Sequence, residues 1–454
     1  MGLSQLKQTE NTAQRKTIIV GLGKSGLSCA RFLLRQGVEV MVVDSRANPP
    51  AKQQLQNEFP EVETQFGGFD MELFEQADML VVSPGVSLRA PAIAAAIEAG
   101  VEVVGDIELF ARYAQAPVIA ITGSNGKSTV TTMVGEMAKA ASKDVCVGGN
   151  IGTPVLDLLQ ADEPDLYVLE LSSFQLETTS SLKPVAAVVL NVSQDHLDRY
   201  SDMQDYAEAK QRIYAGAAIK LINRDDVLVA SWCGEDQSWI RFSLHQPQHS
   251  NDFGVVQQDG QSWLAKGEQL LLPVSELKVA GKHNVANALA ALALGESVAL
   301  PMAAMLEALR SFAGLPHRCQ WLAEKDGVSW FNDSKATNVG AAVASINGMA
   351  GKVVLLAGGE AKGQDFSELR KALSDKGRAT VLFGADADQI AAVLDGVLPV
   401  RCVASLPDAV AAAQALAHAG DAVLLAPACA SFDMFSGYED RGNQFAAAVA
   451  EVLA

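Results

Sequence analysis

The sequence predicts an α/β fold made of three successive α/β units. Its 454 residues are too many for a single hydrophobic core, and a chain of this length is expected to hold about three domains. Short apolar runs of strand type alternate with stretches of helical type, an order that implies parallel sheets joined by crossover helices. This alternation begins three times, near Thr17, near Pro117 and after Pro316.

The first unit carries a glycine-rich turn directly after its first strand. We expect strands at 17–20, 38–43 and 79–82 and a helix at 27–36 that ends before Gly37. The turn at 21–26 (GLGKSG), with Asp44 beyond it at the end of the second strand, fits a fingerprint for binding a dinucleotide. The pattern indicates a site for a nucleotide diphosphate, and NAD is one candidate. We expect this unit to close near Gly105, which makes the first domain 1–105.

The second unit places polar residues where its strands end. We expect strands at 117–122, 166–170 and 186–192, a helix at 130–141 and a small β-rich region within 219–280. Ligands of open parallel sheets bind at the carboxyl ends of the strands. In this unit that edge would carry Thr122, Glu170, Asn191 and the loop to His196.

The third unit begins after Gly314, so the second and third domains are expected at 106–314 and 315–454. Its strands are expected at 328–331, 353–357, 379–383 and 423–426. The polar segments 315–318, 332–338 and 427–433 follow a domain start or a strand end, where ligand-binding loops often lie. Each segment taken separately is equally compatible with an ordinary surface loop.

The composition is that of a globular protein, with 49% hydrophobic and 19% charged residues. The first residues lack the apolar core of a signal peptide, and no apolar run is long enough to span a bilayer, so we expect a cytoplasmic protein. The six cysteines have no CxxC pairing, which indicates reduced and mostly buried thiols. The net charge of −18 disfavours nucleic acid and membrane partners. We expect a monomer that acts on small molecules and binds any phosphate groups locally.

The strongest motif is a short phosphate-binding loop formed by Gly123, Ser124, Asn125, Gly126, Lys127, Ser128 and Thr129. An apolar strand precedes it and a helical stretch follows it, which is the context that this motif requires. The glycines let successive N–H groups point at phosphate oxygens, Lys127 is positioned for the β- and γ-phosphates of ATP, and Ser128 can hold Mg²⁺. Ile121 stands where the general pattern has its first glycine, so the loop is a shorter variant. The alternative is a glycine-rich turn with an incidental lysine.

Three further residues are candidates for metal binding or catalysis. Glu170 closes an apolar strand, where a carboxylate is well placed to hold a hard cation against phosphates; the alternative is a solvent-facing strand end. His196 follows another strand end, although a single histidine is usually structural. Lys210 interrupts an apolar helical stripe that includes Tyr206 and Tyr214. From the residues alone we favour a snorkelling Lys210, with its stem buried and its ammonium group in water.

These motifs occur in order along nearly the whole chain. The short P-loop, 170–177 (ELSSFQLE), Asp195-His196, Lys210, 315–318 (LPHR) and 332–338 (NDSKATN) together resemble the Mur ligases of peptidoglycan synthesis. Within this family, 333–338 and 428–443 resemble the members that add D-glutamate to UDP-N-acetylmuramoyl-L-alanine. The resemblance implies ATP-dependent amide-bond formation through an acyl phosphate. It also implies a UDP-binding Rossmann-like domain, a central ATP-binding P-loop domain and a Rossmann-like C-terminal domain that binds the amino acid.

The resemblance assigns residues to each substrate and to the metal. The UDP-substrate would contact Lys24, Ser25, Asp44, Ser45, Arg46, Gly85 and Asn150. ATP would contact the P-loop together with Asn284, Asn287, Arg318, Asp333 and Lys335. D-Glutamate would contact Thr337, Lys362, Ser431, Phe432 and Tyr438, the last of which stands where the family leads us to expect Phe. Catalysis would rest on Lys127, Glu170, His196 and Lys210, and two Mg²⁺ ions would be held by Ser128, Glu170, His196 and a carbamylated Lys210.

Three other functions are compatible with parts of the sequence. An NAD-dependent dehydrogenase would explain the N-terminal glycines but would leave the P-loop and Glu170 without a role. A ligase that adds glutamates to folate would share the ATP chemistry. A binding module gated by ATP would need no catalytic residues.

Overall fold

The computed structural model describes residues 16–159, 162–196, 199–234, 236, 238–279 and 281–453. The first residues, on which the expectation of a missing signal peptide rests, lie outside this part of the chain. The chain divides into two compact units, of which the first comprises the residues up to 192, 196–242 and 290–305. The second unit comprises residues 193–195, 243–289 and 306–454. Among the described residues, no helix combines the length and the apolar character needed to cross a bilayer.

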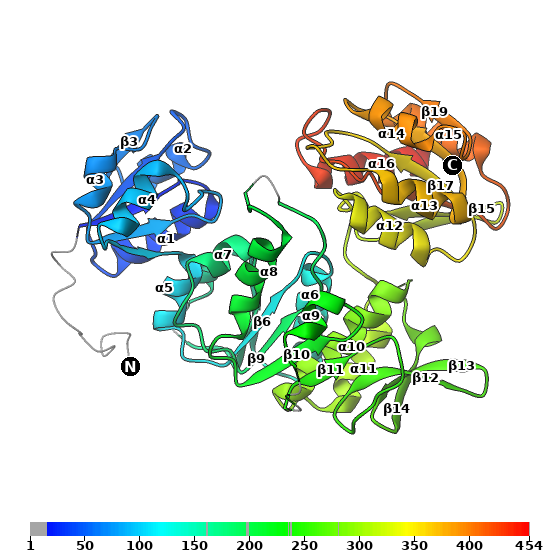
Figure 1. Cartoon of the computed structure of the whole chain (residues 1–454), viewed down its shortest axis with the longest axis horizontal. Helices are drawn as coiled ribbons and strands as arrows, with labels where there is room; N and C mark the ends of the chain where they lie inside the picture. The colour runs from blue at the N-terminus through cyan, green and yellow to red at the C-terminus, as the bar shows by residue number, and fades with distance from the viewer. Residues whose placement is uncertain are drawn as a thin grey trace. The chain divides into compact units, whose positions relative to one another are not determined.

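The first sheet, drawn in blue in Figure 1, has the parallel strand order β3-β2-β1-β4-β5. Its strands are β1 (Thr17–Val20), β2 (Val40–Asp44), β3 (Glu63–Phe66), β4 (Met79–Val82) and β5 (Glu102–Val104). Its helices are α1 (Lys24–Arg35), α2 (Lys52–Glu58), α3 (Met71–Glu75) and α4 (Pro91–Glu98). The helix predicted at 27–36 begins three residues earlier, because the backbone is already helical after Gly23. The end of the glycine turn is therefore the first turn of α1.

The central sheet of the first unit contains six parallel strands in the order β11-β10-β9-β6-β8-β7. These strands are β6 (Val118–Thr122), β7 (Val145–Gly149), β8 (Leu166–Glu170), β9 (Ala186–Val189), β10 (Ile219–Asn223) and β11 (Ile240–Phe242). The helical elements around them are α5 (Asp106–Tyr113), α6 (Lys127–Ala140), η2 (Val155–Leu158), α7 (Ser173–Glu177), α8 (Met203–Gln211), η3 (Arg212–Tyr214) and α9 (Val227–Ser231). The strand predicted at 186–192 ends at Val189, because the chain then turns to bond the phosphate loop.

The second unit begins with an antiparallel meander of β12 (Phe253–Gln258), β13 (Gln261–Lys266) and β14 (Gln269–Pro273). The turns that connect these strands contain Asp259, Gly260 and Gly267, all with positive φ. The meander confirms the β-rich region only in part, since 219–280 also contains a strand of the parallel sheet and α9. The helices η4 (Val274–Glu276), α10 (Lys282–Ser297) and α11 (Met302–Ser311) follow.

The third sheet, yellow to red in Figure 1, has the order β15-β16-β20-β17-β18-β19, with only β15 antiparallel to its neighbour. Its strands are β15 (Gln320–Lys325), β16 (Val328–Asn332), β17 (Val353–Ala357), β18 (Gly377–Leu382), β19 (Val400–Cys402) and β20 (Ala422–Leu425). Its helices are α12 (Val339–Gly348), α13 (Ser367–Lys376), α14 (Ala387–Leu394), α15 (Leu406–Leu416) and α16 (Tyr438–Leu453). The side chains of β17 alternate between two apolar clusters, as expected for a sheet covered on both faces.

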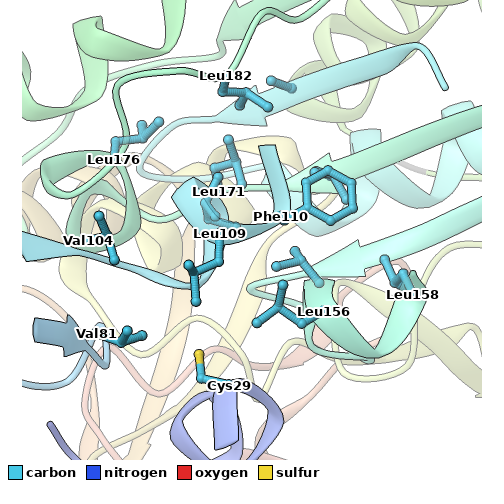
Figure 2. Packing of buried hydrophobic residues seen from close by; sticks show 14 of the residues in the cluster. Cys29, Val81, Val104, Leu109, Phe110, Leu156, Leu158, Leu171, Leu176 and Leu182 are labelled. Atoms are coloured by element: carbon cyan, nitrogen blue, oxygen red, sulfur yellow. The ribbon is translucent and has the colours of Figure 1, made fainter. Parts of the chain in front are cut away.

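One apolar cluster runs through both sheets of the first unit. Figure 2 shows Cys29 of α1 and Val81 of β4 in the same cluster as Phe110, Leu156 and Leu176 from the central sheet and its helices. The predicted burial of the cysteines is only partly right, because Cys29 and Cys429 are buried whereas the other four are partly or fully exposed. All six are free thiols.

A charged residue joins α5 to the segment after α7. The Glu108 carboxylate accepts hydrogen bonds from the N–H groups of Ser180 (2.8 Å) and Ser181 (2.9 Å) and from Arg112 (3.1 Å). Burial alone would raise the pKa of Glu108, but these donors lower the pKa from 4.5 to about 2. Because the folded pKa is depressed, the contact stabilises the fold above the ordinary pKa of a glutamate and is lost as the pH falls toward 2.

Glu108→Gln should therefore lower the free energy of unfolding by about 1–2 kcal/mol at about pH 7, after allowance for screening by solvent. The difference between the variant and the wild type should shrink as the pH falls below about 4.5, because the wild-type carboxylate is then protonated on unfolding. Urea unfolding at several pH values measures this difference. Glu98→Gln, at an exposed position at the end of α4, is the control. An equal effect of both substitutions would contradict the role of Glu108.

Candidate active site

The phosphate loop lies between β6 and α6, where the sequence predicts it. Gly123 and Gly126 have φ of 153° and 86°, so both need the conformational freedom of glycine. A Cβ atom on Gly123 would lie 3.0 Å from Cβ of Leu190. Asn191, which follows β9, holds the loop: its Oδ1 accepts from the Asn125 N–H (2.8 Å) and its Nδ2 donates to the Asn125 carbonyl (3.0 Å). The strand end beside β6 therefore sets the shape of the loop.

Two lysines donate to the same loop carbonyl. Lys127 Nζ lies 2.7 Å from the Gly123 oxygen and 3.0 Å from the Ser124 oxygen. Lys210 Nζ, from α8, lies 2.9 Å from the Gly123 oxygen. Two positive charges thus meet at one backbone oxygen, an arrangement that favours a negatively charged group beside them.

The snorkelling interpretation of Lys210 is wrong. Its side chain is only 1% exposed, so the ammonium group is buried and does not lie in bulk water. The ammonium group lies 4.5 Å from the centre of the Tyr206 ring, a cation–π contact within the same helix. The helical stripe places Lys210 in the interior correctly, but the loop that receives its ammonium group is 87 residues away in sequence.

Glu170 ends β8, directly beside the strand that leads into the phosphate loop. It is 3% exposed, so the solvent-facing alternative is wrong. Its Oε1 accepts from Asn150 Nδ2 at 2.7 Å, whereas its buried Oε2 has no hydrogen-bond partner among the described residues. A buried carboxylate oxygen without a donor is costly unless a cation balances it. Glu170 and the buried hydroxyl of Ser128 are oxygen ligands of the kind that Mg²⁺ prefers.

His196 lies in an aromatic cluster that reaches the phosphate loop. The centre of its ring is 4.8 Å from that of Phe174 and 6.1 Å from that of Tyr206. The Tyr206 hydroxyl is in turn 3.2 Å from Ser124 Oγ. His196 has a positive φ of 55°, an uncommon backbone conformation that often marks a functional position. Tyr206 thus contacts Ser124, His196 and Lys210, although the sequence predicted no functional role for it.

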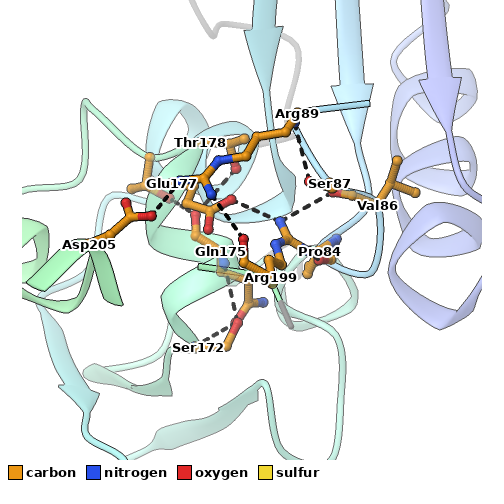
Figure 3. Close-up of polar contacts among 11 residues, drawn as sticks. Pro84, Val86, Ser87, Arg89, Ser172, Gln175, Glu177, Thr178, Arg199 and Asp205 are labelled. Carbon is orange, nitrogen blue, oxygen red and sulfur yellow. Dashed lines mark hydrogen bonds and ion pairs between the residues drawn. The ribbon is translucent and has the colours of Figure 1, made fainter. Parts of the chain in front are cut away.

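A polar network, drawn in Figure 3, joins the turn after β4 to the segment that follows His196. Arg199 donates to the carbonyls of Pro84 (2.7 Å) and Val86 (3.2 Å), on either side of Gly85, and to Glu177 (2.8 Å). Arg89 pairs with Asp205 and donates to the Arg199 carbonyl. This network places Gly85 close to the helices of the central sheet. The sequence motifs did not single out either arginine.

The glycine turn lies at the switch point of the first sheet, between β1 and β4. Ser83 Oγ donates to the Gly21 carbonyl at 2.7 Å, and a Cβ on Gly26 would lie 1.9 Å from the same oxygen, so only glycine fits there. Asp44 accepts from the Leu22 N–H and pairs with Arg46, both at 2.7 Å. Burial would raise the pKa of Asp44, but the hydrogen bonds from Arg46 and Leu22 hold it below its ordinary value. The exposed residues of this group are Lys24, Ser45, Arg46 and Gly85.

Asn150 lies next to Glu170, beyond the end of β7 in the central sheet. In addition to its side-chain bond, its N–H donates to the Glu170 carbonyl at 2.8 Å.

Asn284 and Asn287 lie in the first turns of α10, where both are buried and Asn287 Nδ2 donates to Asn284 Oδ1 at 3.2 Å. Among the described residues, no three His, Cys, Asp or Glu side chains form a metal-binding group.

Most of the predicted residues of the last third lie beyond the carboxyl ends of β16, β17 and β20, and Tyr438 begins α16. Lys335 Nζ lies 3.9 Å from the centre of the Tyr438 ring, and Lys362 Nζ lies 5.6 Å from that of Phe432. Phe432 is 67% exposed, which is unusual for a phenylalanine. The other predicted residues here are the buried Ser431, Thr337 near the start of α12 and Arg318 next to His317.

Asp333 is a buried carboxyl group in this cluster. It accepts from the Cys319 N–H at 3.2 Å and from the Ser345 hydroxyl. Burial raises the pKa of Asp333 to about 6, and the hydrogen bonds offset this only in part. Strongly shifted carboxyl groups at strand ends are typical of functional sites.

Three family models match consecutive parts of the chain. The Mur ligase MurD-like N-terminal domain matches residues 15–105, the Mur ligase middle domain 121–295 and the Mur ligase glutamate ligase domain 317–429. Relatives named UDP-N-acetylmuramoylalanine–D-glutamate ligase include one from Nitrosococcus oceani, 54% identical over 96% of this chain and 97% of its own. Another, from Pseudomonas aeruginosa, is 55% identical over 96% of this chain and 98% of its own.

Two solved structures share the fold at low sequence identity. A pseudomurein peptide ligase type C from Methanothermus fervidus superposes with a TM-score of 0.61 at 18% identity, over 97% of this chain and 100% of its own. A UDP-N-acetylmuramate–alanine ligase from Thermotoga maritima superposes with a TM-score of 0.60 at 19% identity, over the same shares. These matches confirm the predicted three-domain α/β architecture.

The raised pKa of Asp333 makes the stability of the fold depend on pH. A carboxyl whose folded pKa lies above its unfolded value stabilises the fold while it is protonated, and stability falls as the pH rises from about 4 to about 6. Asp333→Asn should remove this decline and raise the free energy of unfolding at about pH 7 by about 2 kcal/mol. Chemical unfolding of the ligand-free protein across this range tests the prediction. Asp326→Asn, in the exposed turn before β16, is the control. If the free energy of unfolding of Asp333→Asn depends on pH as that of the wild type does, the predicted role of Asp333 is contradicted.

Proposed function

The chain belongs to the Mur ligase family, and from this we propose that it joins D-glutamate to UDP-N-acetylmuramoyl-L-alanine at the expense of ATP. The reaction yields ADP and phosphate and serves the synthesis of peptidoglycan precursors. The names and the full-length similarity of the relatives support this substrate pair. They favour it over the dehydrogenase, folate ligase and binding-module alternatives. The observation that supports phosphoryl chemistry at this site is the phosphate loop with Lys127 bonded across it, next to the buried Glu170 at the end of the neighbouring strand.

We propose a UDP-binding domain at 1–105, an ATP-binding domain at 106–314 and an amino-acid-binding domain at 315–454. The UDP-substrate is assigned to Lys24, Ser25, Asp44, Ser45, Arg46, Gly85 and Asn150. ATP is assigned to Gly123, Ser124, Asn125, Gly126, Lys127, Ser128, Thr129, Asn284, Asn287, Arg318, Asp333 and Lys335. D-Glutamate is assigned to Thr337, Lys362, Ser431, Phe432 and Tyr438. The negative net charge supports small-molecule partners over nucleic acid, and we propose a cytoplasmic monomer.

The chemistry has to make a carboxylate electrophilic. An oxygen of the alanyl carboxylate forms a bond to the γ-phosphorus of ATP, and the bond from that phosphorus to the bridging oxygen of ADP breaks. The neutral amine of D-glutamate then bonds to the acyl carbon, phosphate leaves and the nitrogen loses a proton. Lys127 and the loop N–H groups offset the negative charge of the phosphates as the first step proceeds. The neighbouring strand end holds the loop through Asn191 in the geometry that this requires.

The residues at the strand ends fit a divalent cation. Glu170 Oε2 is buried without a partner among the described residues, and the Ser128 hydroxyl lies in the first turn of α6. Mg²⁺ held by these two oxygens would neutralise phosphate charge and make the γ-phosphorus easier to attack. This chain's own contribution is to hold both oxygens in a buried, preformed position.

We propose that Lys210 is carbamylated and that the carbamate, with His196, binds a second Mg²⁺. In this modification the neutral amine bonds to the carbon of CO₂ and loses a proton, so that a cation becomes an anion. The position of Lys210 supports the change, because a second ammonium group beside Lys127 is electrostatically unfavourable. An anion beside Lys127 would instead be stabilised.

Lys127→Ala should lower kcat/KM for ligation by roughly 10²–10³-fold or more, because the charge of the transferred phosphoryl group loses its nearest cation. Affinity for the UDP-substrate should stay unchanged in calorimetry. Lys139→Ala, on the exposed face of the same helix, is the matched control. Near-normal turnover in Lys127→Ala would refute the assignment of the loop.

Lys210→Ala should be nearly inactive and should recover part of its activity with added formate or acetate, which replace the carbamate anion. Lys210→Arg keeps the charge but cannot be carbamylated, so it should remain inactive and should not respond to these salts. Carbon-13 NMR with labelled bicarbonate should show a carbamate signal in the wild type that both variants lack. A fully active wild-type enzyme without this signal would exclude the carbamate.

A further inference from the structure

A buried arginine lies beneath the loops at the carboxyl edge of the third sheet. Arg441 is in the first turns of α16 and is 0% exposed. Its Nε donates to Ser334 Oγ (3.0 Å), and its Nη2 donates to the carbonyls of Ser334 (2.9 Å) and Cys429 (3.2 Å). Its Nη1 donates to the carbonyls of Cys429 and Ala430, both at 3.3 Å, and more weakly to that of Gly358 at 3.5 Å. The guanidinium group therefore serves three separate chain segments at once.

Each of these segments follows a strand, and the three strands are neighbours in the sheet. Ser334 comes after β16, Gly358 after β17, and Cys429 and Ala430 after β20, in the order β16-β20-β17. These carbonyl groups lie beyond the ends of the named strands, and a donor with a fixed fork geometry can hold several of them at once. Arg441 thereby sets the positions of the three loops relative to one another.

These loops carry residues that we assigned to both substrates of the C-terminal region. Asp333 and Lys335, assigned to ATP, flank Ser334, while Ser431 and Phe432, assigned to D-glutamate, follow Ala430 directly. Lys362 lies shortly beyond Gly358, and the two segments that follow β17 and β20 are themselves bonded through Glu360 and Ala430, at 3.1 and 3.0 Å. A shift of any one loop would therefore move residues of both groups.

The start of α16 is bonded to the loop after β16 as well. Ser334 Oγ donates to the Tyr438 carbonyl (2.8 Å), and Asn332 Nδ2 donates to the Gly442 carbonyl (2.9 Å). A Cβ on Gly442 would lie 2.2 Å from His317 Nδ1, so the helix approaches as closely as glycine permits. The helix thus brings Tyr438 and Arg441 to the loop that holds Asp333 and Lys335.

The hydrogen-bond acceptors of Arg441 are a hydroxyl group and backbone carbonyls. Because none of these acceptors is charged, they offset the free-energy cost of burying the guanidinium cation only in part. Burial lowers the pKa of this guanidinium to about 10, although the nearby charge of Asp433 opposes this shift. Replacement of Arg441 by an apolar side chain would leave the carbonyls of Ser334, Gly358 and Cys429 without this donor, and a buried acceptor that loses its donor costs free energy. A positive charge under these loops suits a substrate that brings two carboxylates.

We propose that Arg441 is a positioning residue that holds the loops after β16, β17 and β20 in register, so that the D-glutamate and nucleotide groups form together. The proposal rests on the function proposed above, because the loop residues take their assignments from it. Arg441 acts through the loops and is not itself a catalytic residue.

The test compares Arg441→Lys, Arg441→Met and Arg441→Ala with the wild type. The wild type must itself ligate D-glutamate. A wild type that does not would contradict the proposed function and would not bear on the role of Arg441. We expect the KM values for D-glutamate and for ATP to rise about ten- to hundredfold in all three variants, because small displacements of loop residues have effects of this size. The KM for the UDP-substrate should stay within twofold. Ethylguanidine should restore part of the D-glutamate affinity of Arg441→Ala. Arg370→Ala is the matched control, since Arg370 also donates to two carbonyls, those of Val393 and Asp395, but its side chain is exposed.

Two results would overturn the proposal. One is an unchanged KM for D-glutamate in Arg441→Met. The other is an equal rise in the KM of all three substrates together with a lower Tm, which would show a structural role alone. If Arg441→Ala does not fold, Arg441→Lys and Arg441→Met, which fill most of the same volume, give the same comparison.

Discussion

The candidate active site is organised around the Gly123 carbonyl oxygen, which accepts hydrogen bonds from both Lys127 and Lys210. A chain with a net charge of −18 cannot attract phosphates by its overall field, so binding must depend on a few cations placed at one spot. The left-handed glycines of the loop, the Asn191 amide and the buried face of α8 bring the two lysine side chains together, so that Lys127 is the cation for phosphate and Lys210 lies where its proposed carbamylation would supply an anion. Glu170 adds a buried negative charge at the adjacent strand end, and this combination of opposite charges suits a nucleotide triphosphate with its metal.

The two sheets of the first unit are joined by different forces at different places. The apolar cluster of Figure 2 stabilises this part of the fold, because it removes large side chains around both sheets from water. The arginine network of Figure 3 fixes the relative positions of its segments, because Arg199 and Arg89 bond specific carbonyls and carboxylates. The Arg89–Asp205 pair lies at the surface, where ion pairs stabilise a fold only slightly, whereas Arg199 and Glu177 are largely buried. Their effect is to keep the turn at Gly85 in a defined position beside the central sheet.

Two charged groups at the third sheet are buried at a cost in free energy. Asp333 has a raised pKa and Arg441 a lowered one, both because burial disfavours their charged forms. Both groups lie at the carboxyl edge of the sheet, where a nucleotide and an amino acid with two carboxylates are proposed to bind. A core of apolar residues on both faces of the sheet, including all of β17, offsets the cost of these groups.

The sequence by itself determined the three α/β units, the phosphate loop and the strand end at Glu170. These features depend on local patterns: apolar runs of strand length, glycines at turns and the spacing of a helical stripe. The edge or near-edge strands β3, β5, β7, β15 and β19 escaped prediction, because short or partly exposed strands carry little apolar signal. Only the tertiary structure decided that Lys210 is buried under Gly123, that Asn150 bonds Glu170 and that Arg441 joins three loops. Each of these contacts joins residues far apart in the chain, and no local pattern records which distant carbonyl or carboxylate a side chain will meet.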